Sequence, residues 1–158
     1  MARSRSPDVL MLIIDDLRAD LGSYGVSWAR TPHMDALSRQ GVTFLQAHAS
    51  LANCAPSRSS LLTGLRPDTH GVLDLTTHVR DRHPQLTTLP QRFRAAGYLA
   101  VAYGKIFHQL TLQSPQGSNP QVNGRQISHR RAQIIAVGIA NNNPLTCPIQ
   151  ASVTSLLR

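Results

Sequence analysis

The feature that most constrains the fold is an alternation of apolar runs with capped helical segments in the first two thirds of the chain. The runs DVLMLII (residues 8–14) and YLAVAY (residues 98–103) are continuous and β-rich, which is typical of strands buried on both faces of a parallel sheet. VTFLQAHAS (residues 42–50) alternates apolar and polar residues and predicts another strand. Strands separated by helices predict an α/β fold with a mostly parallel sheet.

Three segments between these runs carry the end signals of helices. Residues 31–41 and 88–97 each begin with threonine, continue with an early proline and end at glycine, the pattern of an N-cap, a first turn and a C-cap. A third helix is predicted to begin near Pro56 and to end at Gly64. Cys54 therefore lies at a helix N-terminus, where free N–H groups and the helix dipole stabilise a thiolate or another anion.

The charge of the chain favours an anionic partner but argues against nucleic acid. The 158 residues carry a net charge of +8, and this length suits about one domain. Fifteen arginines are dispersed around a single lysine, and aromatic residues make up 4% of the chain, so few side chains are available to stack on bases. We therefore predict no nucleic-acid partner. No apolar stretch approaches the roughly 20 residues of a membrane span.

Acidic residues are confined to the first 81 residues of the chain. All eight are aspartates and the last is Asp81, so residues 110–158 contain no acid. This part is rich in turn residues around one apolar run, IIAVGIA. We place a boundary after residue 109 and predict that 110–158 is a divergent tail, either disordered or read from a different frame or foreign join.

Two polar clusters follow predicted strands, where α/β sheets bind their ligands. Asp15 and Asp16 end the first strand, and two adjacent carboxylates repel each other unless a cation such as a hard divalent metal neutralises them. The alternative is that Asp16 caps a turn while Asp15 is solvated. GKIFH places Lys105 and His108 beyond a later strand; the alternative here is a solvated lysine and a hydrogen-bonded loop histidine.

Cys54 has a cationic neighbour one helical turn away, Arg58. The alternative for a lone cysteine is a small buried apolar residue. Cys54 and Cys147 give neither a disulfide framework nor a metal-ligand spacing. A cysteine protease is disfavoured, because no local Cys/His arrangement with an orienting Asn or Asp stands out.

Together these clusters resemble the sulfatase family. CAPSR matches its Cys-x-Pro-Ser-Arg signature. Four other segments have the family's order and spacing along the chain: LIIDDLRADLGSYG, RTPHMDALSRQGVTF, TLPQRFRAAGY and GKIFH. With its phenylalanine, GKIFH resembles the corresponding motif of the iduronate-2-sulfatase-like subgroup. The resemblance to the family spans about residues 8–108. It implies the three-layer α/β sandwich of the alkaline-phosphatase superfamily, incomplete in this chain, with residues 1–109 as the N-terminal part of the catalytic domain.

The resemblance also implies a metal site and a modified nucleophile. Asp15 and Asp16 match ligands of Ca²⁺, with Mg²⁺ as the alternative ion. Cys54 matches the residue that a formylglycine-generating enzyme oxidises to formylglycine. In the family the hydrated aldehyde binds the metal and attacks sulfur, and its second hydroxyl lets the covalent sulfate be expelled.

Three further positions match groups around the sulfate. Arg58 matches the residue that steadies the formylglycine and metal end of the site, while Lys105 and His108 match groups that contact the sulfate ester and the nucleophile. The implied activity is sulfuric ester hydrolysis, with a sulfated sugar or other sulfated molecule as substrate. A cation, an arginine, a lysine and a helix N-terminus suit a transition state that places charge on oxygen.

The chain departs from the family after His108, where the expected proline-glycine turn is replaced by Gln109. No acid follows Asp81 to supply the family's later metal ligand. We therefore expect an N-terminal sulfatase fragment joined to a non-homologous end. The alternatives to an active enzyme are a catalytically inert fragment and a basic protein that binds an anionic glycan.

The N-terminus does not read as a secretory signal. The apolar run VLMLII is followed by two aspartates, whereas a signal peptide needs about 7 to 15 apolar residues and a small-residue cleavage site. The default expectation is a cytoplasmic location, although the family is often exported or lysosomal.

Overall fold

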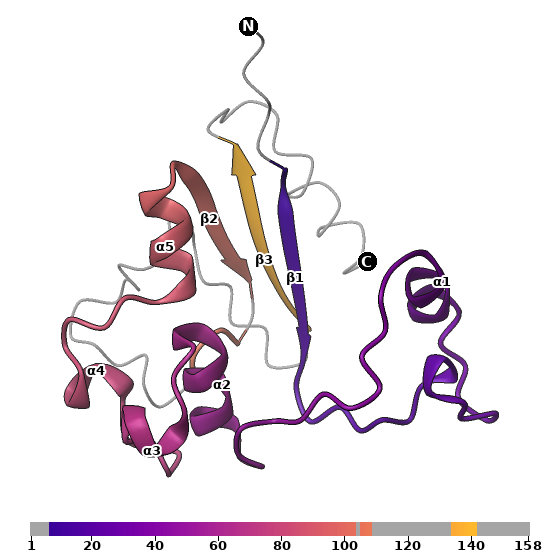
Figure 1. Cartoon of the computed structure of the whole chain (residues 1–158), viewed down its shortest axis with the longest axis horizontal. Helices are drawn as coiled ribbons and strands as arrows, with labels where there is room; N and C mark the ends of the chain where they lie inside the picture. Colours follow the sequence, from indigo (N-terminus) through magenta and orange to yellow (C-terminus); the bar gives the residue numbers. More distant parts are fainter. Residues whose placement is uncertain (1–6, 104, 109–133, 142–158) are drawn as a thin grey trace, which may run out of the picture. The chain divides into compact units, whose positions relative to one another are not determined.

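A computed structural model describes residues 7–103, 105–108 and 134–141 (Figure 1). The chain falls into two compact units: residues 15–49 form the smaller one, and the larger one combines the preceding strand with the chain from Ser50 onward. Within the described ranges, no helix has the length and apolar character needed to cross a membrane.

Strand β1, Val9–Ile14, forms where the sequence predicts it. Its side chains alternate between two environments: Val9, Met11 and Ile13 pack against the core, while Leu10 and Leu12 are 45% and 50% exposed. The prediction that both faces of this strand are buried is therefore wrong. An uninterrupted apolar run does not reveal by itself which face the rest of the chain covers.

Strands β2, Tyr98–Tyr103, and β3, Ile134–Asn141, complete a sheet in the order β1-β3-β2. β3 is antiparallel to both neighbours, with Val9 opposite Ile139 and Tyr98 opposite Asn141. The prediction of a mostly parallel sheet is wrong for the pairings described. The reason is that β3 comes from the apolar run of the predicted tail, and it takes the place between two strands that run in the same direction.

Helix α2, Cys54–Thr63, contributes to the core of the larger unit. Its Leu62 forms a buried cluster with Ile106 and Phe107, against which the inward side chains of β1 pack. The helix ends at Gly64, whose φ of 73° lies in the left-handed region that glycine adopts without strain. The predicted helix is confirmed, and it begins two residues before Pro56.

Helix α5, Leu89–Ala95, confirms the predicted helix at residues 88–97. The Thr88 N–H donates to Gln91 Oε1 at 2.8 Å, which closes the first turn. Phe93 then packs edge-on against Tyr98 of β2, with ring centroids 5.3 Å apart. The helix thus leads directly into the strand on which it packs.

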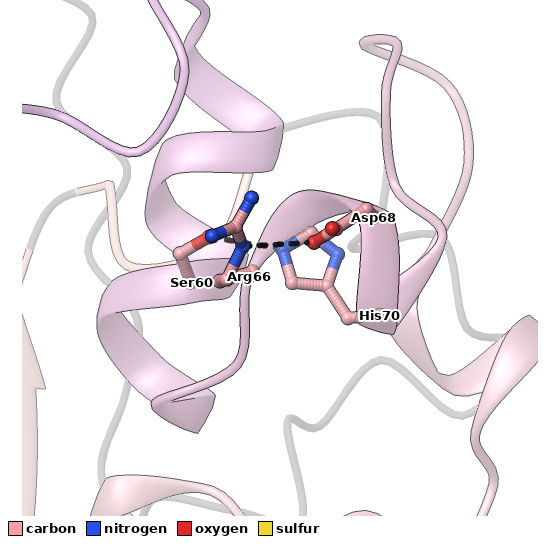
Figure 2. A network of polar contacts seen from close by, with 4 residues as sticks. All are labelled: Ser60, Arg66, Asp68 and His70. Atoms are coloured by element: carbon pink, nitrogen blue, oxygen red, sulfur yellow. Dashed lines mark hydrogen bonds and ion pairs between the residues drawn. The ribbon is translucent and has the colours of Figure 1, made fainter.

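Two single-turn helices, α3 (Pro67–His70) and α4 (Val79–Arg82), join α2 to α5. His70 is fully buried and lies between α3 and α2 (Figure 2). Its Nδ1 accepts the Val72 N–H at 3.1 Å, so the proton lies on Nε2, which donates to Ser60 Oγ at 3.0 Å. Nearby, Arg66 pairs with Asp68 at 3.2 Å on the surface.

The smaller unit holds the 3-10 helix η1, Gly22–Tyr24, and helix α1, Pro32–Gln40, as predicted for residues 31–41. Thr31 Oγ1 accepts the Gly22 N–H and donates to Asp35 Oδ1, both at 2.9 Å. A Cβ at Gly22 would lie 2.5 Å from Asp35 Oδ2, so any larger residue there would force the Asp35 side chain to shift.

The strand predicted for residues 42–50 does not form. Val42, Phe44 and Leu45 are 80%, 72% and 72% exposed, and the segment is described as loop and turns. Alternating polarity stabilises a strand only where a neighbouring strand pairs with it, and residues 42–50 pair with none of the described strands.

The buried His70 predicts an acid-sensitive fold. Burial lowers the pKa of His70 from its ordinary value of 6.5, so the unfolded chain binds the proton first. Its contribution to stability is full above about pH 6.5 and is lost as the pH falls toward the lower native pKa. We expect the free energy of unfolding, from urea melts at about pH 7.5 and about pH 5.5, to fall more in the wild type than in His70→Asn.

Asparagine keeps an acceptor for the Val72 N–H but does not titrate. His33→Asn changes an exposed histidine and is expected to leave the wild-type pH dependence intact. Equal pH dependence in the wild type and His70→Asn would contradict the prediction.

Candidate active site

Cys54 is the first residue of α2, as the sequence predicts. Its thiol is free and half-buried. The preceding Asn53 is extended, with φ −153° and ψ 142°, and its side chain makes no capping bond. The positive end of the helix dipole therefore acts on whatever group residue 54 carries.

Arg58 connects α2 to the GKIFH segment. The side chain is buried, with 5% of the residue exposed, and its Nη1 donates to the backbone oxygens of Lys105 at 2.6 Å and of Ile106 at 3.3 Å. Two residues that the sequence groups only by family resemblance, Arg58 and Lys105, thus lie together. A buried guanidinium bound to carbonyl oxygens fixes this segment against the helix.

Arg58 and His108 line the same small cavity, which has room for about one water molecule. Its walls come from α2, from the start of α4 and from the segment after β2, and comprise Ala55, Arg58, Ser59, His78, Val79, Phe107 and His108. Of the predicted site residues in the larger unit, Arg58, Lys105 and His108 are therefore brought together near the first two turns of α2.

His78 is a residue of this cavity that the sequence did not single out. It is the N-cap of α4. Its ring Nδ1 accepts the Arg80 backbone N–H, and its backbone N–H donates to Asp81 Oδ2, both at 3.2 Å. Burial lowers the pKa of His78, which favours the neutral ring. Histidine is not a usual N-cap, so the sequence carries no signal that would have marked it.

Asp15 and Asp16 belong to the smaller unit and follow β1 directly. A carboxylate oxygen of each lies within 4.8 Å of the other. Asp16 has φ 53°, the one positive φ outside glycine in the described residues; aspartate tolerates this conformation, but it still carries strain. Two hard oxygen donors close together fit a divalent cation such as Ca²⁺ or Mg²⁺.

Comparisons with known proteins test the predicted family. The Sulfatase family model matches residues 7–124. The chain belongs to the sulfatase family. The predicted family is thereby confirmed, and membership implies the α/β fold of alkaline-phosphatase-like enzymes, while the three-layer sandwich stays a prediction.

Individual sulfatases match the same part of the chain. Iduronate 2-sulfatases of Mus musculus and Homo sapiens are each 44% identical over 101 residues, which cover 64% of this chain and 18% of theirs. A sulfatase of Formosa agariphila is 35% identical over 126 residues, covering 75% of this chain and 24% of its own. The chain thus spans about a fifth of the length of these relatives.

The two carbonyl contacts predict a selective role for Arg58 in stability. Arg58→Lys keeps the charge, but an ammonium lacks the planar fork of donors and leaves buried polar groups poorly paired. We expect a loss of about 1–3 kcal/mol in the free energy of unfolding, measured by urea denaturation. Arg18→Lys, at a side chain that is 84% exposed, is expected to change stability by less than about 0.5 kcal/mol; equal losses would contradict this.

Proposed function

We propose that this chain carries the nucleophile and sulfate-binding part of a sulfuric ester hydrolase site. The observation that carries the proposal is the grouping of Arg58, Lys105 and His108 beside the helix that begins at Cys54, in a chain of the sulfatase family.

Cys54 is the proposed nucleophile after oxidation of its thiol to the formylglycine aldehyde by a formylglycine-generating enzyme. Its half-buried position at the start of α2 places it beside the backbone N–H groups of the first helical turn. The positive helix end stabilises developing negative charge at this residue. Arg58, one turn along α2, adds a fixed positive charge.

Lys105 and His108 are proposed to contact the sulfate ester. Both are half-buried, and the Arg58 bonds to the backbone at residues 105 and 106 hold the segment that carries them. Hydrogen-bond donors fixed in place stabilise charge on the sulfate oxygens without reorganising during the reaction. The names of several relatives, such as iduronate 2-sulfatase and N-sulphoglucosamine sulphohydrolase, support a sulfated sugar as the substrate.

Asp15 and Asp16 are the proposed protein ligands of a divalent cation, calcium or else magnesium, together with residue 54. Asp15 directly follows Ile14, the last residue of β1, and the two aspartates offer carboxylate oxygens within 4.8 Å of each other. When bound, the cation would supply positive charge to the sulfate oxygens. Its other effect is to relieve the repulsion between the two carboxylates.

Modification of Cys54 is the first test. We expect peptide mass spectrometry of the chain from its native host to find formylglycine at position 54, and any hydrolysis of an aryl sulfate in the presence of calcium to depend on that residue. Cys54→Ala is expected to lower turnover at least about a thousandfold, whereas Cys147→Ala keeps it. An unmodified Cys54 would contradict the proposal. Salt-sensitive glycan binding that survives Cys54→Ala would favour the alternative of a basic glycan-binding protein, which the net charge of +8 supports.

The metal site predicts opposite effects with and without calcium. Asp16→Asn removes one of two repelling carboxylates and tolerates the positive φ, so we expect stability without calcium to equal or exceed the wild type. The wild type should gain about 2.7 kcal/mol at free calcium of about 100 times Kd, and the variant should gain far less. Thermal melts measure both, and Asp20→Asn, at the surface pair with Arg18, should behave as the wild type.

A further inference from the structure

His78 is held on two sides in a way that its role as a helix cap does not require. On the α4 side, Nδ1 accepts the Arg80 N–H and the backbone N–H donates to Asp81. On the other side, its ring lies against Phe107, with ring centroids 6.4 Å apart and planes inclined at 56°. Phe107 is buried and directly precedes His108. The histidine ring therefore lies between a helix start and the segment that carries a proposed sulfate ligand.

The loop that delivers His78 is itself ordered by hydrogen bonds. Asp74 Oδ1 accepts the N–H groups of Thr76 at 2.8 Å and Thr77 at 2.6 Å, and Asp74 Oδ2 accepts the Thr77 hydroxyl at 2.8 Å. These bonds lower the pKa of Asp74 to about 2. The backbone of Thr77, the residue before His78, is thus fixed by Asp74. The His78 ring is therefore positioned both by its own hydrogen bonds and by the ordered loop that precedes it.

We propose that His78 is a positioning residue of the sulfate site, which holds the Phe107–His108 segment against α4 and so sets how His108 and Arg58 face their shared cavity. The proposal rests on the proposed function only in taking this segment to bind sulfate. Nothing in the family resemblance assigns a role to position 78.

Histidine combines two properties at this position that simpler residues separate. Asparagine would cap α4 equally well, because its side-chain oxygen accepts an N–H of the first turn. Phenylalanine would keep a ring against Phe107 but offers no acceptor. The Arg80 bond requires an unprotonated Nδ1, so the proton lies on Nε2 of the neutral ring. The lowered pKa of His78 agrees with this neutral form beside the cationic Arg58.

The experiment compares His78→Asn with His78→Phe in the 158-residue chain. Inorganic sulfate is the binding probe, urea denaturation measures stability, and ring NMR signals report on His108. His78→Asn is expected to weaken sulfate binding about tenfold while stability stays near the wild type. His78→Phe is expected to bind sulfate within about threefold of the wild type, because it keeps the ring, while stability falls through loss of the cap. His48→Asn, at an exposed histidine, should change neither.

Opposite effects of the two substitutions support positioning, because a purely structural role would lower sulfate affinity and stability in parallel; that parallel result would overturn the proposal. If the protein turns over, His78→Asn should lower kcat more than it raises KM. If the wild type binds no sulfate, the proposed function fails, and the His108 ring signals decide the positioning role: they shift in His78→Asn and stay in place in His78→Phe. Unchanged signals in His78→Asn would overturn it.

The wild-type chain gives a result that does not depend on how the variants fold. The ¹⁵N shifts of the His78 ring are expected to show the proton on Nε2 and a bare Nδ1 at neutral pH. A proton on Nδ1 would overturn the proposal.

Discussion

The arrangement of the candidate site depends on one buried cation, the guanidinium of Arg58. It bonds to the carbonyl oxygens of Lys105 and Ile106. These two residues lie 47 and 48 positions after Arg58 in the sequence, so the guanidinium ties a distant segment to helix α2. The same segment places Ile106 and Phe107 in the core with Leu62 of α2. The hydrophobic contact and the charged hydrogen bonds therefore hold the same two pieces of chain. If either the hydrophobic contact or the Arg58 hydrogen bonds were removed, only the other interaction would remain to position Lys105 and His108.

Helix α2 serves both halves of this arrangement because of how its residues are distributed. Leu62, near its end, packs against β1 and the core, whereas Cys54, at its start, is half-buried. Its dipole and free N–H groups act at the start. Ala55, next to Cys54, packs with Val72 and Val79, so α2 is held by packing at both ends while residue 54 itself stays half-buried. In the smaller unit, the positive φ of Asp16 is a cost that a bound cation would offset.

The sequence predicted the elements that local signals determine. β1, β2, α1, α2 and α5 form where apolar runs, prolines and terminal glycines indicate, and Cys54 lies at a helix start as expected. The failures are long-range. The position of β3 between β1 and β2 joins a segment past residue 130 to the first strand, and nothing local specifies such a partner. The strand predicted at residues 42–50 fails for the same reason, since alternation alone supplies no neighbour.

The sequence did not mark His78 for a further reason. His78 is one of three residues that make the same local hydrogen bond, and these three residues share no sequence motif. His70, Asp74 and His78 each accept the N–H two residues ahead, from Val72, Thr76 and Arg80. This places a side-chain acceptor at every fourth position between α3 and α4, in a stretch where the backbone forms no long helix. In two of the three the acceptor is an imidazole Nδ1, which accepts only while it is unprotonated. Acid therefore acts on this loop by converting two acceptors into donors. Loosening of the loop would reach the candidate site, because His78 lines the cavity with Arg58 and His108, and also the core, because Val72 and Val79 pack with Ala55.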